Sequence, residues 1–344
     1  MADVLEIARG VLNGAEAWIV GGAVRDELLG RPLIDLDVAC REPERVARAF
    51  AGQSGGAPFP LSERHGAWRV VIDDGKTVDF TPLPGSIEDD LATRDFTVNA
   101  IALPLSGGEA ADPFEGRADL EARVLRAVQA AVFEQDPLRL LRAVRLEDEL
   151  GFRLEVRTER LVREQAGLVT KAAGERILAE LIRLSVAGWL RLAEVGLLER
   201  LGGSLERADR AGAVDEPGYR LVSFLGDSVG LLPISRELRR YAIRLLRSVP
   251  PESGSPRSIH RFRRATEPWA LEALALHGAQ EHSDAVRQAR LEDPAEPLLR
   301  GDELDLPPGP KIGKALERIA EERAAGTIAT REEALELVRR EFDR

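Results

Sequence analysis

Two kinds of hydrophobic pattern divide the chain. Up to about residue 128, short runs alternate between apolar and polar positions, which is typical of half-buried strands. A helical pattern at residues 23–29 ends at Gly30, and the apolar run at residues 96–103 fits either a strand or a buried helix. The alternation predicts strands at residues 17–20, 33–39, 68–73 and 77–81, with Asp74-Gly75 as the hairpin turn between the last two.

From Asp136 onward the strand signals fade, and sequence rich in Leu, Ala, Arg and Glu continues with a helical period to the end. After the last proline and glycine break, a capping box at Thr330 and Glu333 predicts the second of two packed helices. The whole pattern predicts an α/β head followed by an all-helical remainder. The breaks fall near residues 202–203, 212–218, 250–256 and 307–310.

Composition places the chain among globular proteins. Its 344 residues suffice for two or three domains, and 44% of them are hydrophobic while 31% are charged. The sequence shows no secretion signal and no stretch that could span a bilayer, and its single cysteine, Cys40, excludes an intramolecular disulfide. We therefore expect a cytoplasmic protein without membrane association. Because the net charge is −11, nucleic-acid binding would need local basic patches.

Two aspartates interrupt the second predicted strand, in the stretch IDLDV. Alternate residues of a strand share a face, so Asp35 and Asp37 point to one side and their apolar neighbours to the other. Two adjacent carboxylates repel each other unless a cation lies between them, although a strand with one wet face explains the same spacing. Asp79 faces the same way if its strand is a neighbour, and three carboxylates would form the oxygen-rich site that Mg²⁺ prefers.

A glycine pair marks the end of the first predicted strand. Gly21 and Gly22 would let a phosphate approach backbone N–H groups at the start of the next helix. Arg25 would add a charged contact one turn later. Taken alone, the pair is better explained as a simple turn.

Two further groups of polar residues suit a nucleotide. Arg94, Asp95 and Asn99 combine a cation, an anion and an amide, which can bind a ribose hydroxyl and a triphosphate; a solvated charge pair is the alternative. Asp136 followed by Pro137 predicts a helix start with Asp136 as the N-cap. Together with Arg139 it could offer an acceptor and donors to a base edge, or it could be only a cap beside a solvated arginine stripe.

In this order the motifs resemble a known family. GGAVRD, IDLD, VDF, DLATRDFTVNAIAL, DPFEGRADL and QDPLRLLRAVR together resemble the class II tRNA nucleotidyltransferases. That family comprises CCA-adding enzymes, CC-adding and A-adding relatives, and bacterial poly(A) polymerases. The resemblance implies an α+β fold, in which a nucleotidyltransferase-type α/β head with a mixed sheet precedes a helical neck, body and tail. The implied boundaries are 1–128 for the catalytic head, 129–200 for the base-reading neck, 201–298 for the body and 299–344 for the RNA-binding tail.

The resemblance also implies roles for individual residues. Asp35 and Asp37 match the family's metal-binding pair, with Mg²⁺ as the cofactor, and Asp79 matches its third catalytic acid. The pair that reads the incoming base matches Asp136 and Arg139. Nucleotide binding is implied for Gly21, Gly22, Arg25, Arg94, Asp95, Asn99, Asp136, Arg139 and Arg142.

Departures from the family pattern bear on the product. Gln135 and Thr93 replace a usual glutamate and a usual arginine. Only FTPLPGSIEDDLAT separates Asp79 from Arg94, whereas CCA-adding members usually have a longer flexible loop there, which switches them from C to A addition. The short interval resembles the CC-adding subgroup. We therefore expect a tRNA 3′-terminal nucleotidyltransferase that uses CTP, with ATP use in question.

Three alternatives follow in order of preference: a complete CCA-adding enzyme, a poly(A) polymerase and a non-catalytic RNA-binding module. Retention of all three acids argues against the last. Basic clusters in the helical half are the candidates for contacts with tRNA phosphates, although a solvated helix face explains either cluster alone. The clusters are Arg236, Arg239, Arg240 and Arg244, and Arg257, Arg261, Arg263 and Arg264.

Overall fold

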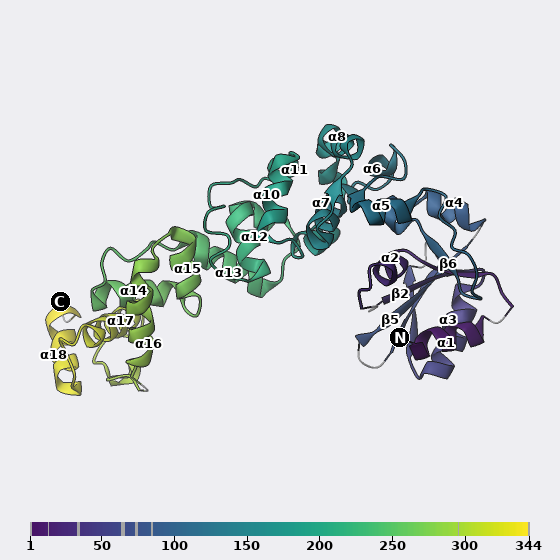
Figure 1. Cartoon of the computed structure of the whole chain (residues 1–344). Helices are drawn as coiled ribbons and strands as arrows, with labels where there is room; N and C mark the ends of the chain where they lie inside the picture. The colour runs from purple at the N-terminus through teal and green to yellow at the C-terminus, as the bar shows by residue number, and fades with distance from the viewer. Residues whose placement is uncertain are drawn as a thin grey trace. The chain divides into compact units, whose positions relative to one another are not determined.

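The chain forms two compact units in a computed structural model (Figure 1). The model describes residues 2–12, 14–32, 35–62, 66–72, 75–83, 85–294 and 296–342. The first unit is Met1–Glu180 with Arg191–Arg200, and the second is Leu181–Leu190 with Leu201–Arg344. The first unit therefore holds the predicted head and most of the predicted neck, and the second holds the predicted body and tail.

A mixed sheet organises the first unit. Its strands are β1 (Ala17–Val20), β2 (Asp35–Cys40), β3 (Ala57–Ser62), β4 (Ala67–Val71), β5 (Thr77–Pro82) and β6 (Ala102–Pro104). Among the described residues their order is β3-β4-β5-β2-β1-β6, with β2 and β5 parallel and the other neighbours antiparallel. The β4-β5 pairing confirms the predicted hairpin. Residues 33 and 34 of the predicted second strand, and 73 and 74 of the predicted turn region, lie outside the described residues.

Helix α3 (Pro43–Ser54) packs on one face of the sheet, with α1 (Ala2–Val11) beside it (Figure 1). The rings of Phe50 in α3 and Phe80 in β5 lie 5.5 Å apart on this face. Val38 of β2 is fully buried there as well. Because side chains alternate along a strand, the polar residues of β2 and β5 project from the opposite face.

The apolar run at residues 96–103 is neither one strand nor one α-helix. It forms the 3₁₀ turn η2 (Thr97–Asn99) followed by β6, and residues 95–102 are all buried, which explains their composition. A short parallel pair joins β7 (Val124–Leu125) to β8 (Arg153–Leu154). The other helices up to residue 200 are α2 (Gly22–Leu28), α4 (Ile87–Ala92), α5 (Gly116–Ala122), α6 (Val132–Gln135), α7 (Arg139–Leu150), α8 (Val156–Gln165), η3 (Ala166–Lys171), α9 (Gly174–Leu181), α10 (Val186–Glu194) and α11 (Leu197–Arg200).

The second unit is helical. Its last two helices pack around a core that includes Ile319 and Leu337. The predicted capping box is confirmed: Thr330 N–H donates to the Glu333 carboxylate at 2.9 Å, and Glu333 N–H donates to the Thr330 hydroxyl at 3.3 Å. The helices are α12 (Pro217–Leu225), η4 (Gly226–Leu231), α13 (Arg236–Arg247), α14 (Pro256–Thr266), α15 (Ala270–His277), η5 (Gln280–His282), α16 (Ser283–Leu291), η6 (Gly301–Glu303), α17 (Pro310–Ala324) and α18 (Arg331–Phe342).

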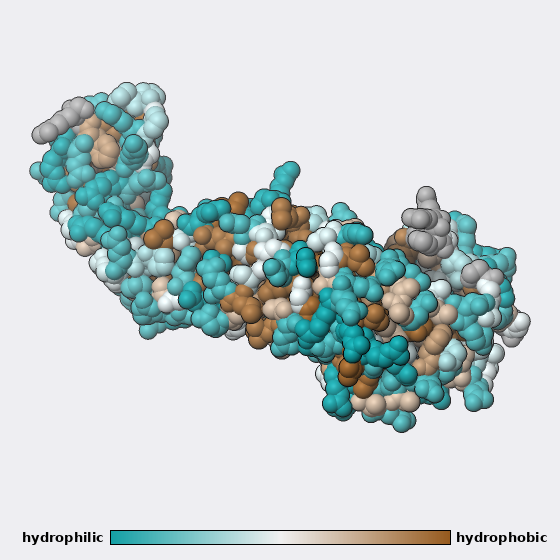
Figure 2. All heavy atoms as spheres, turned by 90° about the horizontal axis from the view of Figure 1, so that it is seen from above, coloured by the Kyte–Doolittle hydropathy of each residue, from teal (hydrophilic) through white to brown (hydrophobic). Residues whose placement is uncertain are grey.

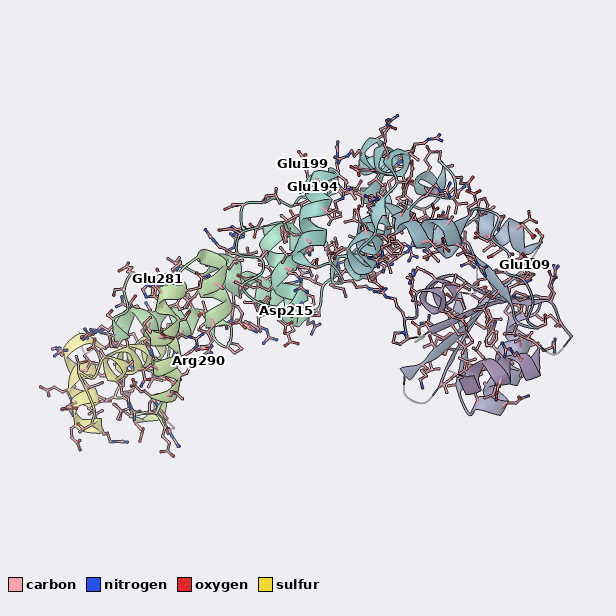
Figure 3. The ribbon with its side chains drawn as sticks, in the orientation of Figure 1. Glu109, Glu194, Glu199, Asp215, Glu281 and Arg290 are labelled. Atoms are coloured by element: carbon pink, nitrogen blue, oxygen red, sulfur yellow. The ribbon has the colours of Figure 1, made fainter. Side chains whose placement is uncertain are left out.

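The surface carries many charged side chains. On the face seen in Figure 2, hydrophobic residues appear in scattered groups between hydrophilic ones. Charged residues such as Glu199 and Glu281 extend away from the ribbon (Figure 3). Within the described ranges, no helix has both the length and the apolar character needed to cross a membrane.

Candidate active site

Asp35, Asp37 and Asp79 lie on neighbouring strands of the sheet. Strands β2 and β5 are parallel, and their register pairs Asp37 directly with Asp79. Leu36 and Val38 are 1% and 0% exposed, so the apolar residues of β2 face the core as predicted. Three carboxylates therefore share the face of the sheet opposite α3.

Arg69 of β4 is a further member of this cluster that the motifs do not identify. Its Nε and Nη2 donate to the two carboxylate oxygens of Asp79, each at 2.7 Å. The two residues are cross-strand partners in the β4-β5 pair. Positions 69 and 79 are equally distant from residue 74, and residues equidistant from a hairpin turn lie opposite each other. The predicted hairpin therefore implies this pairing.

The electrostatics of the cluster suit a cation. Burial raises the pKa of Asp37 to about 6, and the negative charge of Asp79 adds to this effect, while Arg94 opposes it. In the described part of the chain, no three Asp, Glu, His or Cys side chains are arranged to hold one ion. Asp79 is bound to Arg69, so Asp35 and Asp37 are the two carboxylates that fit a divalent cation, which prefers oxygen ligands.

The glycine turn lies beside these acids. Gly21 has φ 73°, in the left-handed region that favours glycine. A Cβ at this position would lie 2.9 Å from a guanidinium nitrogen of Arg94 and 3.1 Å from a carboxylate oxygen of Asp37. Glycine therefore allows the Arg94 guanidinium and the Asp37 carboxylate to lie against the backbone of this turn. Arg94 itself donates to Asp90 at 2.8 Å.

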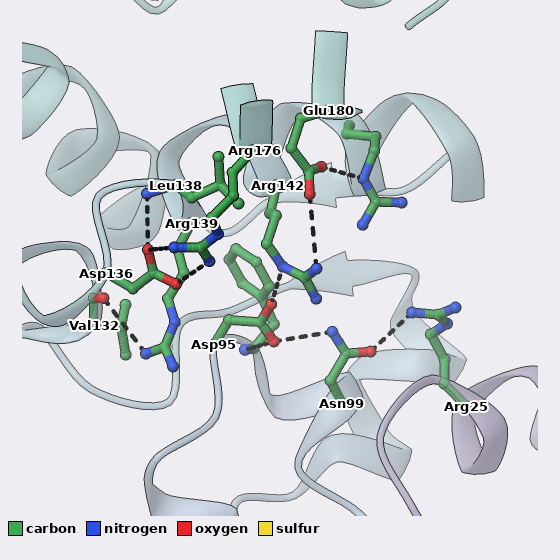
Figure 4. Close-up of polar contacts among 12 residues, drawn as sticks. Arg25, Asp95, Asn99, Val132, Asp136, Leu138, Arg139, Arg142, Arg176 and Glu180 are labelled. Carbon is green, nitrogen blue, oxygen red and sulfur yellow. Dashed lines mark hydrogen bonds and ion pairs between the residues drawn. The ribbon is translucent and has the colours of Figure 1, made fainter. Parts of the chain in front are cut away.

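A chain of hydrogen bonds connects the other predicted nucleotide-binding residues (Figure 4). The Arg25 guanidinium donates to Asn99 Oδ1 at 2.8 Å, and Asn99 Nδ2 donates to Asp95 Oδ1 at 3.0 Å. Arg142 Nε donates to the other oxygen of Asp95 at 2.8 Å. Burial alone would raise the pKa of Asp95, but Arg142 and Asn99 together hold it below its ordinary value. The structure thus brings these four residues together.

The predicted base-reading pair is close but not directly bonded. Both oxygens of Asp136 accept from Arg176, at 3.2 and 2.8 Å, and Arg139 Nη1 donates to the Val132 carbonyl at 3.4 Å (Figure 4). Arg139 Nη2 also donates to the Thr93 carbonyl at 2.7 Å. Burial raises the pKa of Asp136, but the bonds from Arg176 lower it below its ordinary value overall. The two bonds from Arg176 therefore hold the Asp136 carboxylate in one orientation.

The prediction that Asp136 is a helix N-cap is wrong. Asp136 has extended backbone dihedrals and ends α6, and α7 begins at Arg139 with Leu138 as its N-cap. Its side chain nevertheless accepts from the Leu138 N–H at 3.2 Å. The intervening residues form a turn rather than helix, so the helix starts later than Pro137 suggested.

Helix α9 supports the site through two residues that no motif identifies. Arg176 binds Asp136, and Glu180 lies between Arg142, 3.8 Å away, and the buried Arg145, to which it also bonds. Glu180 is itself buried. These contacts join residues far apart in sequence, and no local pattern predicts them.

The two predicted RNA-binding clusters differ in the structure. In α14, all four arginines pair with carboxylates: Arg257 with Glu322, Arg261 with Glu321, Arg263 with Glu267 and Asp293, and Arg264 with Glu317. Three of these four therefore join α14 to α17. In α13, Arg244 donates to two backbone carbonyls. Of the described ion pairs, none involves the exposed side chains of Arg236, Arg239 and Arg240.

Comparison with known proteins agrees with this geometry. The family model for the poly(A) polymerase head domain matches residues 17–84 and 69–126. The CC-adding tRNA nucleotidyltransferase of Geobacter sulfurreducens is 33% identical, over 94% of this chain and 91% of that protein. The A-adding tRNA nucleotidyltransferase of Deinococcus radiodurans is 34% identical, over 94% of this chain and 95% of that protein.

A solved structure points the same way. The crystal structure of the Bacillus stearothermophilus CCA-adding enzyme in complex with CTP has a TM-score of 0.74 and 28% identity, covering 99% of this chain and 98% of that one. The chain therefore belongs to the tRNA nucleotidyltransferase family, as the motifs indicated, and its activity is nucleotidyl transfer.

Proposed function

We propose that the chain is a CC-adding tRNA nucleotidyltransferase, which transfers CMP from CTP to the 3′-hydroxyl of tRNA with Mg²⁺ as cofactor. The observation that carries this proposal is the convergence on one face of a mixed sheet of Asp35, Asp37 and the glycine turn at Gly21, against which the Arg94 guanidinium lies. The names of the full-length relatives support tRNA as the acceptor.

Each part of the reaction has residues suited to it. Asp35 and Asp37 would hold the divalent cation, which when bound stabilises charge on the triphosphate and favours ionisation of the 3′-hydroxyl. The 3′-oxygen forms a bond to the α-phosphorus, and the bond from that phosphorus to the pyrophosphate leaving group breaks. The Arg94 guanidinium lies beside Gly21 and Asp37, where it can contribute positive charge to the triphosphate.

The remaining contacts would select the nucleotide. Asp95 and Asn99 hold each other in one orientation, which suits recognition of a ribose hydroxyl. The Asp136 carboxylate can accept from the exocyclic amino group of cytosine, and Arg139 can donate to the ring acceptors.

The short interval before Arg94 supports CC addition. Residues 80–82 complete β5, and α4 begins at Ile87 after a capping box between Ser86 and Asp89. Ile87 and Leu91 of α4 are 3% and 0% exposed, so this helix is packed into the core. Little chain remains that could rearrange the pocket from C to A. Pro84, within this interval, lies outside the described residues.

The test supplies tRNAs that end before the first C, after C and after CC, with labelled CTP or ATP offered separately, and sequences the products. We expect addition of two C residues, with A addition to a CC end at least roughly a hundredfold slower, which corresponds to about 2.7 kcal/mol of activation free energy. A addition alone, as the name of the Deinococcus radiodurans relative describes, or CCA at comparable rates would overturn the CC assignment. No incorporation of any nucleotide would overturn nucleotidyl transfer to tRNA.

A further inference from the structure

Arg69 and Asp79 form a fixed pair inside the acidic cluster. Both guanidinium–carboxylate distances are 2.7 Å, so the contact is bidentate. The Asp79 side chain is 13% exposed and that of Arg69 is 34% exposed, so water has limited access to the carboxylate. The cross-strand register of β4 and β5 places the two residues opposite each other, which makes the contact a consequence of the fold.

This pair changes the charge that the cluster presents. Asp35, Asp37 and Asp79 would together carry three negative charges, and Arg69 balances one of them. The hydrogen bonds that Arg69 donates to Asp79 raise the pKa of Arg69, and Asp35 and Asp37 add to this, so Arg69 lies within the field of all three acids. Arg94 also acts on Asp37, but its own charge is balanced by its ion pair with Asp90, so the two together add no net charge. The remaining charge of two matches one divalent cation.

Both carboxylate oxygens of Asp79 are already engaged in hydrogen bonds. Each of its oxygens already accepts a short bond from Arg69, whereas Asp35 accepts only from the Thr77 hydroxyl among the described contacts. A metal ion bound by Asp79 would have to displace a bidentate guanidinium.

We propose that Arg69 is a built-in counter-charge of the metal site, which keeps Asp79 out of the metal coordination and makes it a positioning residue for the site rather than a ligand. This inference rests on the proposed function, because it assumes that Asp35 and Asp37 bind the cation. It adds to that function by assigning different roles to the acids. Asp35 and Asp37 bind the metal ion, and Asp79 together with Arg69 sets the affinity of the site for it.

A double-mutant cycle tests the inference, with Mn²⁺ alone as the probe and free Mn²⁺ measured by electron paramagnetic resonance on the full chain. Arg69→Gln leaves a third negative charge beside the ion and should tighten Mn²⁺ binding about tenfold, which is about 1.4 kcal/mol. Asp79→Asn leaves an unpaired guanidinium there and should weaken binding about tenfold. Arg69→Gln combined with Asp79→Asn replaces a neutral pair by another neutral pair, so its affinity should stay within about threefold of wild type.

Other outcomes overturn the inference. If the double variant binds Mn²⁺ as weakly as Asp79→Asn, Asp79 is a ligand. If Arg69→Gln leaves the affinity unchanged, Arg69 is not a counter-charge of the site. Arg69→Lys keeps the charge without the planar fork and should remain within threefold of wild type, which separates charge from local packing.

Two controls separate this inference from the proposed function. Arg45→Met removes a positive charge that pairs with Glu42 at the exposed start of α3, and it should leave Mn²⁺ affinity unchanged. Asp37→Asn should abolish Mn²⁺ binding. If Asp37→Asn binds Mn²⁺ like wild type, the assignment of the metal pair in the proposed function fails. If Asp37 is required for Mn²⁺ binding but the Arg69 and Asp79 variants do not change the affinity as expected, only the role assigned to Arg69 is wrong.

Discussion

Replacing Asp37 by Asn should stabilise the metal-free protein at pH 8 and remove its stabilisation by Mg²⁺. Burial and the charge of Asp79 raise the pKa of Asp37 from 3.8 to about 6, so ionisation is less favourable in the folded state than in the unfolded state. The stability that the protonated form contributes is fully present below pH 3.8 and is lost as the pH rises through about 6. Each unit of pKa difference corresponds to about 1.4 kcal/mol, so the folded protein loses at most about 3 kcal/mol of stability above pH 7.

The magnitude sets the expected shift in unfolding temperature. For a domain of about 150–250 residues, each kcal/mol moves the midpoint by roughly 2–4 °C, so Asp37→Asn should melt roughly 3–10 °C higher than wild type in EDTA at pH 8. At pH 4 the two proteins should melt together, because wild-type Asp37 is then protonated. In Mg²⁺ the order should reverse, since only the wild type gains binding energy from the ion.

The assay is thermal unfolding in EDTA and in MgCl₂ at pH 4, 6 and 8, and hydrogen exchange of the β2 and β5 peptides assigns the transition to the first unit. Asp35→Asn is the matched control, because Asp35 lies on the same strand but is exposed. Asp35→Asn should no longer be stabilised by Mg²⁺, but it should not melt higher than wild type in EDTA at pH 8. The reasoning fails if Asp37→Asn is no more stable than wild type in EDTA at pH 8, or if Mg²⁺ stabilises it equally.

Three further outcomes are expected. Arg139→Ala should raise UTP and GTP misincorporation at least roughly tenfold relative to CTP, measured by sequencing single-turnover products, because a bidentate base contact carries about 1–3 kcal/mol of discrimination; unchanged selectivity would remove Arg139 from base reading. Hydrogen bonds from Arg257 lower the pKa of Glu322 to about 2, so its stabilising effect is present above pH 4.5 and is lost as the pH falls through about 2. Glu322→Gln should therefore destabilise the protein at pH 7 by roughly 1–3 kcal/mol in urea unfolding and by much less at pH 2, whereas equal losses at both pH values would contradict the ion-pair explanation. Arg239→Ala with Arg240→Ala should weaken tRNA binding and reduce its salt-dependence slope by about 1–2, while the ion-paired Arg264→Ala should leave that slope unchanged; the opposite pattern would move the RNA surface to α14.

Local signals predicted β1, β2, β4 and β5 of the first unit but not β3, α1 or α3. These four strands, the hairpin and the placement of Asp35 and Asp37 on one face follow from alternation, because a register error would expose Val38 and bury the acids. The structure of residues 96–103 could not be predicted in this way, because a fully buried segment shows no periodicity. The start of α7 was also misplaced, because Asp136 forms its hydrogen bond in a turn ahead of the helix.

The site was predictable only as far as its motifs reach. The motif residues along the sheet and η2 are close in sequence or joined by strand pairing, so their convergence follows from the topology. Arg176 and Glu180 come from α9, and their partners are set by tertiary packing that no local pattern encodes. The α14 arginines illustrate the opposite error, because an apparently basic surface is balanced by Glu317, Glu321 and Glu322, at least fifty residues further along the chain.

The hydrogen-bond inventory of the base-reading pair suggests why C and A are hard to distinguish here. A carboxylate has about four acceptor positions, and Asp136 uses three of them for the Leu138 N–H and the two bonds from Arg176. One acceptor remains, which suits the single amino group of cytosine but equally that of adenine, while the oxo groups of U and G are repelled. Arg139 can donate to the ring nitrogen of either base. If Asp136 and Arg139 read the base as proposed, hydrogen-bond type would separate C and A from U and G, and the choice between C and A would come from how deeply the base enters the pocket. In the proposed CC-adding reaction that depth would depend on the segment between β5 and Arg94. This segment is short, and its helix α4 is anchored by the buried Ile87 and Leu91, so a pocket that fits C would have little means of enlarging for A.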